Sequence, residues 1–216
     1  RGDLLILADT SNHRVRAVNI GAASTVILGK TIAPGNIDTI LGNGVAANTG
    51  DGMTAQFPAS ISISSPGAFG GGIALDANGN LLYVAAFEGV FGSVGTNRIR
   101  VVNLSGGSLT FATTIIPSTF IDSIVGGGAD AFTSGIDRFS ARISVAGMDL
   151  DSTGRLFWKD FFTVAPFLAI RIRRGDNGTG TVTTISGGFQ DGFGGDNGPA
   201  SAAIWRGRGI LRVHKP

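Results

Sequence analysis

Polar and aliphatic residues alternate with a period of two in three short stretches of the chain. The stretches are residues 12–18, 97–102 and 169–173, and arginine takes two of the polar positions in each. A strand with one packed face and one polar face requires this alternation, because successive side chains of a strand point to opposite sides. The pattern therefore predicts three similar β-strands.

A second pattern is an aliphatic stretch, a short turn containing glycine, and another aliphatic stretch. Residues 72–84 and 147–158 both have this form, and residues 2–7 resemble its second half. Both stretches are typical of β-hairpins, in which we expect Asn78 and Gly79 to have positive φ. The residues interpreted as structural turn residues are Asp76, Asn78, Gly79, Asp151 and Gly154.

A third strand-like pattern ends in glycines and follows each alternating stretch. Its copies are residues 37–44, 121–128 and 182–188. Asn19 and Asn103 each precede the isoleucine that opens this pattern by 18 positions. Equal offsets of this kind indicate internal repeats.

The repeat is long because each unit carries insertions. Segments 21–36, 87–96 and 105–120 lengthen the hairpins, and without them the unit approaches the roughly 40 to 50 residues of a propeller blade. The connections between successive units are residues 49–55, a degenerate copy at 134–141, and 194–202.

Taken in order, these segments resemble the NHL-repeat family of β-propellers, especially its teneurin-like and bacterial secreted members. The best single match is residues 7–16, Leu-Ala-Asp-Thr-Ser-Asn-His-Arg-Val-Arg, which is similar to the strand-turn-strand signature of that repeat. In the family, each blade is a four-stranded antiparallel sheet, and blades pack face to face around a channel. The resemblance implies one all-β propeller region over residues 1–216. Its blade segments would be about 1–48, 49–132 and 133–190, with a further strand in 191–216.

The expected strands number twelve, which makes three blades. Propellers usually have about four to eight blades, so three do not close a ring. Two explanations stay open: the chain is a piece of a longer propeller, or two or more chains combine, for example as a pair. An isolated three-blade monomer would leave edge strands unpaired.

Composition agrees with an all-β fold and limits the chemistry. The chain has 35 glycines and 15% charged residues, which disfavours helices. It has no cysteine, so disulfides and thiolate metal sites are excluded. The formal net charge of +2 does not predict a nucleic-acid partner. No stretch reaches the roughly 18 to 20 apolar residues of a membrane span, so none is expected.

The arginines of the alternating strands are the candidate binding surface. Alternate residues of a strand share a face, so these side chains could line a basic groove for RNA or an acidic glycan. The alternative, which the family resemblance implies, is that each arginine bonds an Asp or Asn of a neighbouring turn. The six residues are Arg14, Arg16, Arg98, Arg100, Arg171 and Arg173.

No catalytic residue, metal site or cofactor is predicted. Some six-bladed propellers are metal-dependent enzymes, but their ligand sets need several His, Asp, Glu or Asn side chains that converge on the channel. The chain has only two histidines, His13 and His214. The run Asp76–Asn80 does not match an EF-hand, because its glycine is fourth and position twelve is Phe87.

These observations predict a non-enzymatic repeat scaffold that binds a protein or glycan outside the cell or at its surface. One alternative is a structural subunit of an extracellular filament or surface assembly that uses edge strands and the 21–36 and 105–120 hairpins as contacts. Another is part of a metal-dependent six-bladed hydrolase or lyase whose ligands lie mostly outside this chain.

Overall fold

The computed structural model describes residues 2–56, 72–86, 97–130, 133–164, 167–188, 192–205 and 211–214. The fold is all-β, as the sequence predicts, and consists of three antiparallel sheets and two separate hairpins. Two expected features, the 87–96 insertion and a strand beginning at 209–211, fall wholly or partly outside the described residues.

The first sheet has the order β1-β2-β5, the middle sheet β6-β12-β9-β8-β7, and the third sheet β13-β17-β16-β15-β14. The strands of the first sheet are β1 (Leu4–Asp9), β2 (Arg14–Asn19) and β5 (Ile37–Leu41). Those of the middle sheet are β6 (Met53–Thr54), β7 (Ile73–Leu75), β8 (Leu81–Ala86), β9 (Arg98–Asn103) and β12 (Phe120–Gly126). Those of the third sheet are β13 (Ile136–Asp137), β14 (Val145–Leu150), β15 (Leu156–Val164), β16 (Phe167–Gly175) and β17 (Thr181–Ser186).

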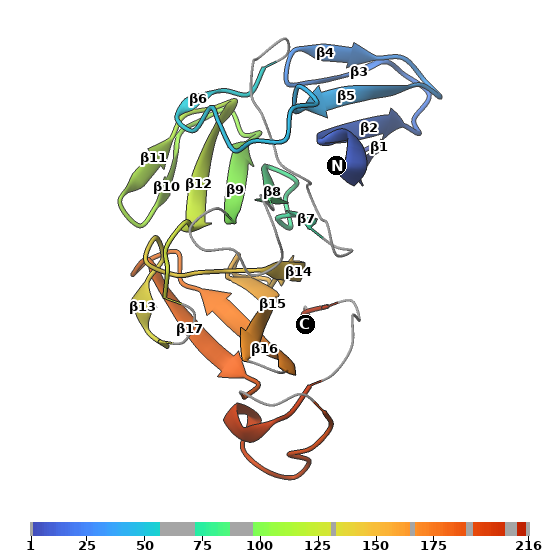
Figure 1. Cartoon of the computed structure of the whole chain (residues 1–216). Helices are drawn as coiled ribbons and strands as arrows, with labels where there is room; N and C mark the ends of the chain where they lie inside the picture. The colour runs from blue at the N-terminus through green and yellow to red at the C-terminus, as the bar shows by residue number, and fades with distance from the viewer. Residues whose placement is uncertain are drawn as a thin grey trace.

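Figure 1 shows the three sheets following one another along an arc, with β1, β7 and β14 toward its concave side and β6 and β13 on its outside. β7 and β14 lie side by side where the middle and third sheets meet. The short strands β6 and β13 come from segments that the sequence suggested were only connections. Each adds an outermost strand to the sheet that follows it along the chain. The described strands do not close a ring.

The middle sheet buries side chains on both of its faces. Leu82 and Val84 belong to an apolar cluster shared with the first sheet, whereas Tyr83 and Ala85, which alternate with them, belong to a cluster shared with the third sheet. Burying an aliphatic side chain of this size contributes about 1.5 to 3 kcal/mol. The middle sheet is therefore held from both sides, and a charged residue at Val84 would disrupt the first of the two contacts.

One β-bulge recurs at the same place in all three sheets. The pairing register shifts by one residue at Ile40 in β5, at Ile124 in β12 and at Ile185 in β17. An extra residue in one strand changes the direction in which the neighbouring side chains point. Ile40 and the next residue, Leu41, are consequently both buried between the first and middle sheets.

The two separate hairpins are β3 (Thr25–Ile27) with β4 (Lys30–Ile32), and β10 (Leu109–Phe111) with β11 (Thr114–Ile116). Each is more than a lengthened loop, because one side of it fills the junction between two sheets. Ile27 and Ile32 are buried with the first and middle sheets, and Phe111 and Ile116 with the middle and third.

A buried asparagine fastens the base of each hairpin. The Asn19 Nδ2 donates to the carbonyls of Ala23 and Ile32, both at 2.8 Å. Asn103 Nδ2 makes the equivalent bonds to Gly107 at 2.8 Å and Ile116 at 2.9 Å. The equal spacing seen around these asparagines in the sequence thus corresponds to one local structure that occurs twice.

Candidate functional site

Two matching turns lie at the junction of the middle and third sheets. In the first, Asp76 Oδ1 accepts bonds from the backbone N–H groups of Asn80 and Leu81 at 2.6 and 2.7 Å. In the second, Asp151 Oδ1 accepts bonds from the backbone N–H groups of Thr153 and Arg155, each at 2.9 Å. The carboxylates therefore hold the turns in shape, which agrees with a structural role.

The backbone of these turns differs in one respect from the prediction. Gly79 has φ of +65° and Gly154 has φ of +81°, but Asn78 is not in the left-handed region. The Asn78 prediction was wrong because it assumed a two-residue hairpin turn, which needs positive φ at both central residues. These loops are longer, and the left-handed glycine alone completes them.

The two turns and strand β10 line a polar cleft of about 290 Å³. Turn residues from both sheets line it, together with hydroxyl and amide side chains. The lining residues are Asp76, Ala77, Asn78, Leu81, Tyr83, Leu109, Thr110, Phe111, Asp151, Ser152, Thr153, Gly154 and Asn177. Four of the five turn residues singled out from the sequence thus meet at one site, and Gly79 is not among the lining residues.

Leu81, Leu109 and two buried aromatic rings form the apolar part of the cleft wall. Tyr83 and Phe111 pack edge to face with centroids 6.1 Å apart. Burial, and then the charge of Asp76, raises the pKa of Tyr83, so its hydroxyl stays protonated. The cleft therefore combines an apolar wall with groups that donate and accept hydrogen bonds.

The hairpin wall of the cleft is fastened to the third sheet by residues from two of its loops. Arg138 donates from Nη1 to the Phe111 carbonyl at 2.9 Å and from Nη2 to Thr114 Oγ1 at 2.8 Å. Asn177 accepts a bond at its backbone carbonyl from the Ala112 N–H, and its Nδ2 donates to the Gly154 carbonyl at 2.9 Å. A ligand would therefore meet a largely preformed wall.

The charge in the cleft is negative. Burial tends to raise the pKa of Asp151, but hydrogen bonds from Thr153 and Arg155 outweigh it and lower the pKa to about 2. The Arg155 Nε also donates to Asp151 Oδ2 at 2.6 Å. Asp151 is thus ionised at neutral pH, and the cleft suits neutral or cationic groups better than anions.

The six arginines do not form one exposed groove. Arg100 is fully buried, and its Nε donates to Asp51 Oδ1 at 2.7 Å. Asp51 lies in the turn before β6. This contact therefore matches the alternative interpretation, in which each arginine bonds an Asp or Asn of a neighbouring turn. Burial lowers the pKa of Arg100, and Asp51 opposes that shift.

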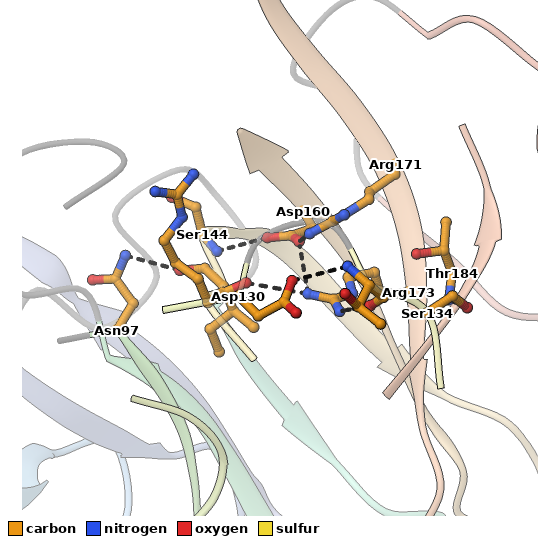
Figure 2. A network of polar contacts seen from close by, with 11 residues as sticks. Asn97, Asp130, Ser134, Ser144, Asp160, Arg171, Arg173 and Thr184 are labelled. Carbon is orange, nitrogen blue, oxygen red and sulfur yellow. Dashed lines mark hydrogen bonds and ion pairs between the residues drawn. The ribbon is translucent and has the colours of Figure 1, made fainter. Parts of the chain in front are cut away.

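Arg171 and Arg173 are also buried, and both face Asp160 of β15 (Figure 2). The Arg171 Nε and Nη2 donate to Asp160 Oδ2 at 3.0 and 2.8 Å, and Arg173 Nη1 lies 3.5 Å from the same oxygen. The other carboxylate oxygen accepts a bond from the Ser144 N–H at 2.6 Å. Burial lowers the pKa of Arg173 to about 10, so the residue is still cationic at neutral pH.

Arg14, Arg16 and Arg98 are only partly buried. The Arg14 guanidinium donates to the carbonyls of Asn12 and Asn43, and Arg16 lies 3.7 Å from Asp9. These side chains remain candidates for contacts with a partner molecule, whereas the three buried arginines form ion pairs inside the protein.

The sequence prediction missed the acidic partners of the buried arginines and the aromatic pair of the cleft. Asp51 lies in a loop that was interpreted as a connection, 49 positions before Arg100. Ser134 stands at the place of Asp51 in the third sheet, and there Asp160 supplies the carboxylate from a different element. The sequence signal for this partner was Asp160 itself, an acidic residue two positions after the tryptophan that ends the second hairpin pattern.

Among the described residues, no group of three or more His, Cys, Asp or Glu side chains is placed to hold a metal ion. None of the helices in that part of the chain has the length and apolarity needed to cross a bilayer. No family model and no curated protein matches the chain.

Proposed function

We propose that the protein is a non-enzymatic binding scaffold whose ligand occupies the cleft between the Asp76 and Asp151 turns. One observation carries this proposal: the cleft lies where two sheets and the hairpin between them meet. Ligand sites favour such junctions between packed units, where a few polar groups converge on an apolar surface.

We further propose that the sheets are blades of an NHL-type β-propeller. Support comes from the face-to-face packing of the middle sheet against both neighbours and from the bulge that recurs in each sheet. Sheets of this kind cannot shield both apolar faces alone, so they stack. A location outside the cell or at its surface is part of the same proposal.

The cleft chemistry favours a glycan over a protein segment. Its volume of about 290 Å³ suits one sugar ring rather than a folded surface. Sugar hydroxyls would exchange hydrogen bonds with Asn78, Thr110 and Ser152, and the apolar face of the ring would lie against the partly exposed Leu81 and Leu109. A negative cleft disfavours acidic sugars, so a neutral or amino sugar is the expected ligand.

The test is a screen of immobilised neutral, amino and acidic glycans, followed by calorimetric titration of the best binder. Asn78→Ala and Thr110→Ala should each weaken binding about tenfold, because one lost hydrogen bond to a ligand costs about 1.4 kcal/mol. Thr31→Ala is the matched control, since this exposed residue occupies the other hairpin. Failure of every glycan to bind, or equal affinity of all three variants, would refute the cleft as the site.

A further inference from the structure

The outer edge of the first sheet lacks a feature that the other two sheets have. β12 is paired on its outer side by β6, and β17 by β13. β5 occupies the corresponding position in the first sheet, where the described strand order ends. The edge of β5 is therefore a template for one more short strand.

In the middle sheet, a specific turn precedes the outer strand. Gly50 has φ of +87° and Gly52 has φ of +71°, and the Met53 N–H donates to the Gly50 carbonyl at 3.2 Å. This turn directs Asp51 onto Arg100, and the Gly52 N–H donates to the Ile121 carbonyl of β12 at 2.9 Å.

The same turn occurs again near the other end of the described chain. Gly195 has φ of +92° and Asn197 has φ of +63°, and the Gly198 N–H donates to the Gly195 carbonyl at 3.1 Å. Asp196 takes the place of Asp51 and is exposed. This turn therefore has the same backbone shape and the same carboxylate as the turn that covers Arg100. Its carboxylate, however, is exposed to solvent.

The first sheet has an arginine at the matching position. Arg16 pairs with Thr39 of β5 in the same register as Arg100 pairs with Ser123 of β12, next to the bulge in both sheets. The Arg16 side chain is 36% exposed and has Asp9 at 3.7 Å, whereas Arg100 is covered and holds Asp51 at 2.6 Å.

An apolar surface surrounds Arg16 on the same face of the first sheet. Leu5, Val18 and Ile37 are aligned across β1, β2 and β5. Leu5 is 50% exposed and Ile37 is 42% exposed. In the middle sheet, the face that carries Arg100 is covered by the preceding sheet, which buries Val102 and Ile121.

We propose that this face and edge of the first sheet bind the third sheet of a second copy of the chain. The Gly195–Gly198 turn of one copy would add along β5 of the other, and Asp196 would pair with Arg16 across the contact. The interface would continue the packing already present between the sheets within one chain. Because the three sheets follow an arc (Figure 1), two copies joined head to tail form a closed pair with two identical contacts.

The test uses charge reversal and sedimentation equilibrium on the whole chain. The wild-type protein should have twice the 22.0 kDa chain mass. Arg16→Asp and Asp196→Arg should each weaken association about tenfold or more, because each places like charges at both contacts. An equimolar mixture of the two variants should recover the pair, since both contacts in the mixed pair then join opposite charges.

The apolar part of the surface has its own variant and control. Leu7→Lys should weaken association, because Leu7 is 38% exposed and pairs with Arg16, which puts it on the proposed contact face. Ile115→Lys should not, because Ile115 is exposed on the β10–β11 hairpin. A wild-type monomer at high concentration would overturn the proposal. So would a mixture of the two charge variants that stays monomeric, or a Leu7→Lys variant that associates as well as Ile115→Lys.

Discussion

Replacement of Asp160 by asparagine should be among the most damaging single changes in the chain. The carboxylate is 1% exposed and lies between the buried guanidinium groups of Arg171 and Arg173. Asparagine keeps the size of the side chain but removes its charge, so both cations would face a neutral amide. Breaking a buried ion pair by removing one partner costs about 3 to 5 kcal/mol.

The loss can be measured by urea unfolding and by thermal unfolding followed with circular dichroism. For a chain of this length, each kcal/mol lowers Tm by about 2 to 4 °C, so a decrease of about 6 to 20 °C is expected. Asp9→Asn is the matched control, since its pair with Arg16 at 3.7 Å is partly exposed and should contribute less than about 1 kcal/mol. Equal losses for the two variants would refute the assignment of Asp160 as the charge that holds this cluster.

Two further predictions concern the hairpins and the cleft. Asn103→Ala should lower the free energy of unfolding by about 1 to 3 kcal/mol, because it leaves the buried Ile116 carbonyl without its donor. Asn36→Ala is the control, since Asn36 is exposed and its loss should change the free energy of unfolding by less than about 0.5 kcal/mol. Equal effects of the two variants would contradict the role of Asn103. Asp151 has a pKa of about 2, below its ordinary 3.8, so its contribution is complete above pH 3.8 and is lost as the pH falls toward 2. From pH 6 to pH 2, the free energy of unfolding obtained by urea titration should therefore fall by about 1 kcal/mol less in Asp151→Asn than in the wild type, after allowance for solvent screening. Parallel curves would show that the turn does not depend on this charge.

The strands were predictable from the sequence because they rest on local alternation. Arg14–Asn19 carries the period-two pattern, and its burial alternates as that pattern predicts. Arg98–Asn103 carries the same pattern and forms a strand, but its last five residues are all buried, because the middle sheet packs on both faces. The 18-residue spacing after Asn19 and Asn103 was also readable, since insertions of equal length fold into equivalent hairpins. In both cases, the information lies within about twenty neighbouring residues.

Contacts between distant segments were not predictable in the same way. The partner of Arg100 lies 49 positions earlier, and the partner of Arg173 lies on a neighbouring strand, although the two arginines share one place in the repeat. Strand pairing within each sheet, of β6 beside β12 and of β15 beside β16, determines which acidic residue reaches each arginine. The cleft also depends on distant segments, because Tyr83 and Asp151 meet across the junction of two sheets.

The central claim is that the middle sheet is packed on both faces, and two adjacent residues of β9 test it most directly. Val101 contacts the cluster shared with the third sheet, Val102 contacts the one shared with the first, and both are fully buried. Val101→Ala and Val102→Ala should each lower the free energy of unfolding by about 2 kcal/mol, whereas the exposed Val26→Ala should change it by less than about 0.5 kcal/mol. If either β9 variant were as mild as Val26→Ala, one face of the sheet would be open and the account would be contradicted.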